Sequence, residues 1–213
     1  GKTKQAEKIN PIYVALERTS VRSNFHGYDK TEVEDAKVLA LVKNDQRVEE
    51  LAEGEEGLIV LDETPYYAES GGQVGDTGKI SGQWTVDSGQ KETTDHRPPT
   101  TVHVFDTFAP IAGIVLHKSK IEKGSIKVGD TVTATVDVAK RDATRRNHTA
   151  THLVHAALKE VLGTHVKQAG SVVAPNYLRF DFTHYQPISE TELREIEDLV
   201  NREILKNDPV NTD

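Results

Sequence analysis

The hydrophobic pattern of the chain changes its period near residue 137. Before this point, short apolar runs bounded by Gly, Asp and Asn predict β-strands at residues 38–42, 57–61 and 114–117. Residues 131–137 alternate in the period of two that is typical of a half-buried strand. Many short strands at such spacing favour a small β-barrel or a β-sandwich.

Beyond residue 137 the apolar positions recur at steps of three and four, which predicts a helix from Asp137 to Gly163. Aspartate commonly caps the start of a helix, and glycine often ends one because it tolerates a left-handed backbone. Residues 171–182 return to strand character, with a turn at Pro175-Asn176. A long helix followed by a short sheet is therefore expected here.

A second amphipathic helix is predicted to begin at Ser189, where Ser-Glu-Thr-Glu has the pattern of a capping box. Asp208-Pro209 ends it. Together the elements predict an α+β fold. A small β-barrel domain would occupy residues 1–136, and an α/β domain with the long helix packed on a sheet would occupy residues 137–213.

Composition narrows the class of protein. Hydrophobic residues make up 36% of the 213 positions and charged residues 28%, which is typical of a folded chain rather than a disordered one. No run approaches the ~18 apolar residues of a membrane span, and no signal segment opens the chain. Cysteine is absent, which excludes disulfide scaffolds, cysteine nucleophiles and all-cysteine zinc sites within these residues. Methionine is also absent, even at position 1, so we expect a piece of a longer protein.

Charge is unevenly distributed. The net charge of −8 argues against a nucleic-acid surface spread over the whole molecule. Residues 141–180, however, carry six Lys/Arg against two acids (+4), whereas residues 181–213 carry three against nine (−6). A basic segment therefore lies within an acidic chain.

Four cations crowd the first turns of the predicted long helix. They are Lys140, Arg141, Arg145 and Arg146. The helix dipole disfavours positive charge there by ~0.3–1 kcal/mol per residue, so this start points to an anionic partner such as phosphate. The alternative is a solvated face that Asp137 and Asp142 partly neutralise.

Two histidines, His148 and His152, lie four residues apart on the same helix and therefore project from one face, close enough to ligate one metal ion. The alternative is a pair of hydrogen-bonded core histidines. The zinc-protease motif is excluded, because it needs Glu directly after the first histidine and Thr149 stands there. Zinc takes four ligands, so further donors are needed. Candidates within the chain, none with persuasive spacing, are His155, His165, Asp181 and His184.

Two further segments carry weaker signals. The paired glycines of Gly71-Gly72-Gln73 permit close approach of the backbone to a ligand or another element, or simply a tight turn. Gln168 lies at the start of a strand after the histidine-bearing helix, where its amide can point at a substrate.

The motifs jointly resemble one family. Residues 145–158 (RRNHTATHLVHAAL), 165–171 (HVKQAGS) and 178–182 (LRFDF) closely resemble the editing domain of alanyl-tRNA synthetase. Residues 61–78 (LDETPYYAESGGQVGDTG) and 25–28 (FHGY) resemble the barrel that precedes that domain. The resemblance covers essentially the whole chain in the right order and is closest to the bacterial type.

This resemblance implies hydrolysis of the ester in tRNA(Ala) mischarged with serine or glycine. A synthetic pocket for alanine cannot strongly reject glycine or nearly isosteric serine, so a second, hydrolytic site is needed. The family's zinc ligands fall on His148 and His152, its serine-reading Thr on Thr151, and its catalytic Gln on Gln168. Zinc would position the aminoacyl end or a water and polarise it.

The resemblance also implies partners and a location. We expect the aminoacyl end of tRNA(Ala) to meet the loop Gly71-Gly72-Gln73, and its phosphates to meet Arg141, Arg145 and Arg146. ATP and alanine would act only through a synthetic domain that is absent from this chain. We expect the protein to be cytoplasmic and not to bind a membrane.

One departure limits what the resemblance implies. The family completes its zinc site with a downstream Cys-x-x-x-His motif, which this chain lacks. We therefore expect a barrel plus an editing core that is incomplete at its C-terminus. The alternatives are a catalytically silent fragment that docks tRNA or a protein, and a free-standing deacylase that edits in trans.

Overall fold

A computed structural model describes residues 10–19, 21–82 and 99–209. The chain divides into two compact units, one made of residues 1–70 and 75–138 and the other of residues 71–74 and 139–213. The fold is α+β, as the sequence predicted.

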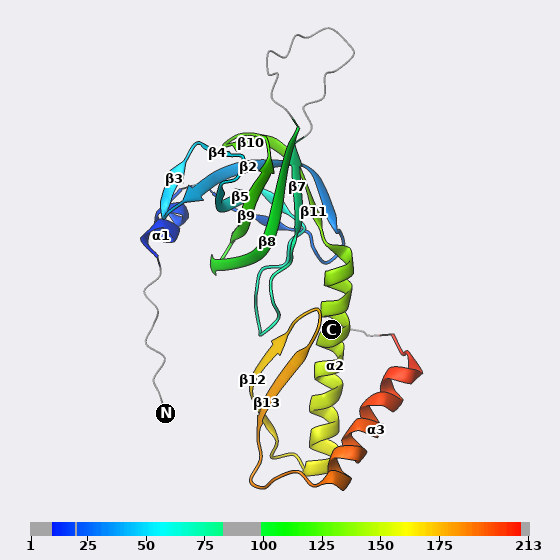
Figure 1. Ribbon diagram of the computed structural model, residues 1–213. Coiled ribbons are helices and arrows are strands. Elements are labelled where there is room, and N and C mark those ends of the chain that lie inside the picture. Colours follow the sequence, from blue (N-terminus) through cyan, green and yellow to red (C-terminus); the bar gives the residue numbers. More distant parts are fainter. Residues whose placement is uncertain (1–9, 20, 83–98, 210–213) are drawn as a thin grey trace. The chain divides into compact units, whose positions relative to one another are not determined.

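The first unit is a closed six-stranded β-barrel (Figure 1). Its strands run in the order β11–β7–β8–β9–β5–β2, all neighbours are antiparallel, and pairing of β11 with β2 closes the barrel. The barrel strands are β2 (Glu32–Lys43), β5 (Glu56–Leu61), β7 (Gly78–Gly82), β8 (Thr100–Ile111), β9 (Ile114–Lys123) and β11 (Thr131–Val136).

Short elements surround the barrel. Strand β3 (Gln46–Val48) extends the sheet beside β2, and helix α1 spans Pro11–Glu17. Two small pairs complete the unit: β1 (Asn24–Phe25) with β6 (Glu63–Thr64), and β4 (Glu50–Ala52) with β10 (Ser125–Lys127).

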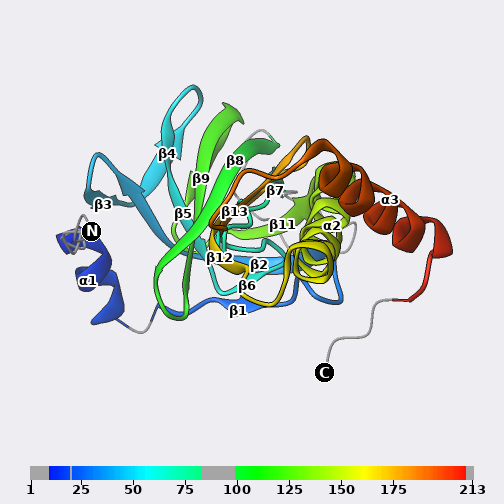
Figure 2. The same ribbon diagram turned by 90° about the horizontal axis from the view of Figure 1, so that it is seen from below.

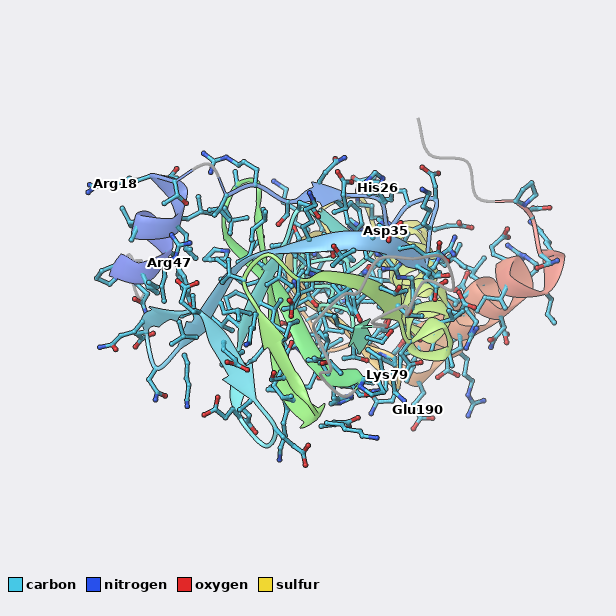
Figure 3. All side chains as sticks on the ribbon, turned by 90° about the horizontal axis from the view of Figure 1, so that it is seen from above. Arg18, His26, Asp35, Arg47, Lys79 and Glu190 are labelled. Carbon is cyan, nitrogen blue, oxygen red and sulfur yellow. The ribbon has the colours of Figure 1, made fainter. Side chains whose placement is uncertain are left out.

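A bulge in β2 helps to close the barrel. Ala36 pairs with Val132 and Val33 pairs with Ala134, so two residues of β2 oppose one residue of β11. Asp35, labelled in Figure 3, lies in this bulge at φ 57°, a left-handed conformation that Asp tolerates better than most residues. Such an extra residue bends the strand, which lets β2 pair with β11 at one end and with β5 further along.

Both faces of β2 are buried over residues 38–42, which explains the continuous apolar run in the sequence. Val38 and Leu41 point into the barrel core. Ala40 and Val42 point to the outer side, where they share a second apolar cluster with Leu16 of α1. The short helix α1 therefore covers an outer face of the sheet that would otherwise expose apolar side chains.

A histidine is fully buried in the first unit. The His117 ring lies 2.8 Å from the carbonyl oxygen of Ile59 through Nδ1 and 2.8 Å from the hydroxyl of Thr64 through Nε2. The Thr64 hydroxyl in turn accepts a hydrogen bond from the backbone N–H of Tyr66 at 3.1 Å. This arrangement holds a neutral ring, with Nδ1 donating and Nε2 accepting, and burial lowers the pKa of His117 to about 4.

The second unit combines two helices with a β-hairpin. Helix α2 (Val138–Leu162) is followed by strands β12 (Lys167–Val173) and β13 (Leu178–Thr183) and by helix α3 (Glu190–Lys206). Figures 1 and 2 show the hairpin beside α2, with α3 on the other side of that helix. The apolar core comprises Ala157, Leu158, Leu162, Val166 and Ile196.

Local signals set the ends of these helices. Gly163, at φ 111°, follows the last residue of α2. At the start of α3 the Ser189 hydroxyl accepts from the Glu192 N–H at 3.2 Å, and the Glu192 carboxylate accepts from the Ser189 N–H at 2.8 Å. The predicted capping box is therefore confirmed. No helix within the described residues combines the length and hydropathy that crossing a membrane requires.

Candidate functional site

The predicted histidine pair lies on one face of α2. The rings of His148 and His152 stack with their centroids 5.2 Å apart and their planes 20° from parallel. Both side chains are exposed. The pair therefore differs from two histidines buried in a core, and it presents two imidazoles to solvent from adjacent turns.

Gln73 holds the first ring of this pair. Its Oε1 lies 2.6 Å from Nδ1 of His148. An amide oxygen only accepts, so Nδ1 donates the hydrogen bond and the neutral ring keeps a lone pair on Nε2. Partial burial and, secondly, the neighbouring His152 lower the pKa of His148, which favours the neutral form that a metal ligand requires.

The segment that carries Gln73 runs beside β12. Gln73 forms a parallel bridge with Val173, flanked by hydrogen bonds from the Val173 N–H to the Gly72 carbonyl (2.8 Å) and from the Val74 N–H to the Val173 carbonyl (3.0 Å). These bonds explain why residues 71–74 belong to the second unit although the chain on both sides belongs to the first.

Within the first unit, the base of this loop is closed by its own hydrogen bonds. The Tyr67 N–H donates to the Asp76 carboxylate at 2.6 Å, and the Asp76 N–H donates to the Tyr67 carbonyl at 2.9 Å. The Thr107 hydroxyl of β8 donates to the Asp76 carbonyl at 2.8 Å. The barrel therefore fixes both ends of the loop.

Gln168 joins the same hydrogen-bonded set from β12. Its amide Nε2 donates to the Ser171 hydroxyl at 3.1 Å, and that hydroxyl donates to the Gly71 carbonyl at 3.4 Å. Residues 71–73 thus contact both the histidine-bearing helix and the strand that carries Gln168. The structure brings His148, Gln73 and Gln168 into one connected region of the second unit.

Thr151 lies on α2 beside the pair and is 8% exposed. Its hydroxyl donates to the Asn147 carbonyl one turn earlier at 2.8 Å. Because the hydroxyl proton is used in this way, the oxygen is left to accept from another group.

The predicted basic residues differ in exposure. Arg145 and Arg146 are exposed, and Arg145 lies 3.8 Å from the Asp142 carboxylate. Arg141 is only 7% exposed. The two exposed arginines are therefore the better placed to meet an anion in solution.

Three other candidate ligands, His165, His184 and Asp181, make contacts of their own. His165 and His184 hydrogen-bond to each other at 2.9 Å, and each ring contacts that of Tyr185 with the centroids 4.7 Å apart and the planes tilted by 37°. His165 and His184 both come after Leu162, the last residue of α2. At the usual rise per residue, Leu162 is itself ~21 Å along the helix from His148. Asp181 forms an ion pair with Arg179 at 3.1 Å.

His155 lies on α2, one turn beyond the pair. Its Nε2 is buried with no hydrogen-bond partner among the described residues, and its ring contacts that of Phe180 at 4.9 Å. Across the described residues, no group of three or more His, Cys, Asp or Glu side chains is arranged to hold a metal ion. The imidazoles of His148 and His152 are nitrogen donors of a type that zinc binds. They would supply two of the four ligands that zinc takes.

Sequence reasoning missed the partners of this site. It placed Gly71-Gly72-Gln73 towards a substrate, and that role stays a prediction, whereas the structure places Gln73 against His148. It did not single out Ser171 as the link between Gln168 and Gly71. The parallel bridge to Val173 is a tertiary pairing and left no local pattern to find.

The family model for tRNA synthetases class II (A) matches residues 1–140, about two thirds of the chain. The chain therefore belongs to this family of aminoacyl-tRNA ligases. Within it, the chain is similar to enzymes named alanine–tRNA ligase. That of Paraburkholderia xenovorans is 42% identical over 209 residues, which cover 98% of this chain and 21% of the relative. That of Burkholderia multivorans is 43% identical over 194 residues, which cover 91% and 20%.

The coverage of these matches is asymmetric. The chain spans about a fifth of the length of the curated relatives. The alignments with these relatives include the histidine pair and the hairpin. The match to the family model ends earlier, at the third residue of α2.

Proposed function

We propose that this chain contributes the editing site of an alanine–tRNA ligase, which hydrolyses the ester of tRNA(Ala) mischarged with serine or glycine. The observation that carries the proposal is the His148–His152 pair, whose first ring is held by Gln73 with a lone pair left on Nε2. Similarity to alanine–tRNA ligases across 98% of the chain supports the substrate class.

The reaction needs few groups from the protein. Water attacks the ester carbonyl, the bond from the carbonyl carbon to the ribose oxygen breaks, and that oxygen takes one proton of the water. The second proton of the water passes to solvent, so the amino acid leaves as a carboxylate. His148 and His152 would hold zinc, which supplies electrophilic polarisation when bound.

The chain's own residues would orient the aminoacyl group. Gln168 is anchored through Ser171, which fixes the position of its amide beside the loop. Thr151 would accept a hydrogen bond from a seryl hydroxyl, since its own proton is donated to Asn147. Glycine lacks that hydroxyl, so Thr151 would assist serine removal more than glycine removal.

The tRNA would approach along the basic start of α2. Arg145 and Arg146 are exposed and can contact backbone phosphates. Such contacts position the acceptor end without reading sequence.

The test is release of serine from Ser-tRNA(Ala), with zinc added and again with a chelator. We expect chelator-sensitive hydrolysis, and we expect His148→Ala and His152→Ala to remove it. The same substitutions in a full-length alanine–tRNA ligase control for ligands outside this chain. Hydrolysis that survives both chelator and substitutions would contradict a metal-assisted site at this pair.

A second function is favoured by one observation: within the described residues no group of three or more metal donors accompanies the His148–His152 pair. A site that supplies two of the four ligands of zinc is consistent with a module that binds tRNA or another protein and catalyses no reaction. Binding of Ser-tRNA(Ala) by this chain without any serine release, alongside activity of the full-length enzyme, would favour that function.

A further inference from the structure

The contact between Gln73 and His148 determines which nitrogen of the ring can bind a metal. The Gln73 Oε1 accepts from His148 Nδ1 at 2.6 Å, so the single ring proton of neutral His148 resides on Nδ1. We infer that Gln73 is a positioning residue, which fixes the tautomer and the orientation of His148 and so makes Nε2 the nitrogen that would bind a metal. This inference rests on the proposed role of His148 as a metal ligand.

The backbone on both sides of Gln73 is held in place. The Gly72 carbonyl accepts from the Val173 N–H at 2.8 Å, and the Val74 N–H donates to the Val173 carbonyl at 3.0 Å. Residue 73 therefore lies between two main-chain hydrogen bonds to β12, and its side chain leaves from a fixed point. A glutamine on an unpaired loop would lose more side-chain and backbone freedom on making the same contact.

The paired glycines give the loop this path. Gly71 and Gly72 have φ values of 59° and 87°, which L-residues with a side chain rarely adopt. A Cβ on Gly72 would lie 2.5 Å from the Ser171 carbonyl oxygen, whereas a Cβ on Gly71 would meet nothing within 4 Å. Gly72 thus allows the close approach to β12 that places the next residue, Gln73, against α2.

Orientation by a remote acceptor is a general requirement of metal-binding histidines. The ring N–H that does not face the metal usually donates to a carboxylate, a carbonyl or water, and removal of that partner typically lowers metal affinity ~10–100-fold. Free imidazole exchanges its proton between the two nitrogens, so an unpartnered ring presents its lone pair on either one. Gln73 removes that ambiguity at His148.

The first experiment reads the tautomer in the metal-free chain. Long-range proton–nitrogen NMR distinguishes a protonated from an unprotonated ring nitrogen, and His148→Ala assigns the signal. We expect His148 with the proton on Nδ1 in the original chain, a mixture of tautomers in Gln73→Ala, and the proton again on Nδ1 in Gln73→Glu, whose carboxylate also accepts. Gln186→Ala, the same change at an exposed position, should match the original chain. A fixed Nδ1–H tautomer in Gln73→Ala would overturn the inference.

The second experiment measures zinc affinity by competition with a coloured chelator. We expect Gln73→Ala to bind zinc ~10–100-fold more weakly, and Gln73→Glu to recover most of that affinity. If His148→Ala weakens zinc binding but Gln73→Ala does not, the positioning role is wrong while the proposed ligand stands. If His148→Ala binds zinc as the original chain does, the proposed ligand itself is wrong, and the tautomer experiment shows separately whether Gln73 orients the ring.

Discussion

Replacing the buried His117 by glutamine should remove much of the acid sensitivity of the barrel. Burial lowers the folded-state pKa of His117 from 6.5 to about 4, so the unfolded chain binds a proton at this residue in a pH range where the folded chain does not. The stability contributed by the neutral ring is therefore present above pH 6.5 and is lost as the pH falls towards 4. Glutamine offers an amide N–H and a carbonyl to the same partners but does not titrate.

The size of the effect follows from the shift. One pKa unit corresponds to about 1.4 kcal/mol, so the change from 6.5 to about 4 amounts to about 3 kcal/mol when fully expressed. Between pH 7.5 and pH 5, about 2 kcal/mol of this should appear in the free energy of unfolding of the barrel. His117→Gln should show a pH difference smaller by that amount, even if the variant is less stable at pH 7.5.

The assay is urea unfolding at the two pH values, followed by the methyl NMR signals of Ile59 and Ile80, which report the barrel core. Ile121→Val is the control, because it costs ~1 kcal/mol in the same core and removes no titratable group. Titration of the His117 ring in the original chain gives an independent value and does not depend on the variant folding. An equal pH difference in His117→Gln and the original chain, or a ring that titrates near pH 6.5, would refute the reasoning.

Three further predictions concern the second unit. Gly72→Ala should lower the stability of the second unit by ~1–3 kcal/mol, because the added Cβ would meet a carbonyl oxygen of β12 at 2.5 Å. Gly71→Asn is the control, because a Cβ at Gly71, which has φ 59°, meets no atom within 4 Å. Equal urea midpoints for the two variants would contradict this prediction. Ser189→Ala should cost ~1 kcal/mol through removal of the cap and speed hydrogen exchange in the first turn of α3, where unchanged exchange would count against the cap. The logarithm of the tRNA-binding constant should fall with the logarithm of the salt concentration. In the double variant Arg145→Ala, Arg146→Ala this slope should be smaller by up to ~0.9 for each phosphate that the two arginines neutralise. An unchanged slope would assign both arginines to a solvated face.

Helices and strands followed from local signals. The capping residues Ser189 and Glu192 are three apart in sequence, and the period change at residue 137 marks the last barrel strand and the start of α2. Such features depend on neighbours along the chain, so a pattern of residue types is enough to find them. The bulge at Asp35 was not visible, because it reflects the pairing of β2 with β11 rather than a preference of the residues around it.

The site depends on contacts that no local pattern encodes. Gln73 and His148 are 75 residues apart, and Gly71 and Ser171 are 100 apart. Helical spacing indicated the imidazole donors at His148 and His152, whereas the role of Gln168 was implied by the family resemblance and not by a local pattern. The sequence held no sign of which loop would orient these residues, because that is decided by the fold of the whole chain.

The closed base of the loop has a consequence for the order of folding. Tyr67 and Asp76 pair across only nine positions, whereas the contact from Gln73 to His148 spans 75. Closing a long loop is slow and costs entropy, and the remaining entropy cost is smaller once the loop ends are already joined. We therefore expect the barrel to fold first and residues 71–74 to dock late, so that a nascent chain acquires its histidine pair well before the glutamine that orients it.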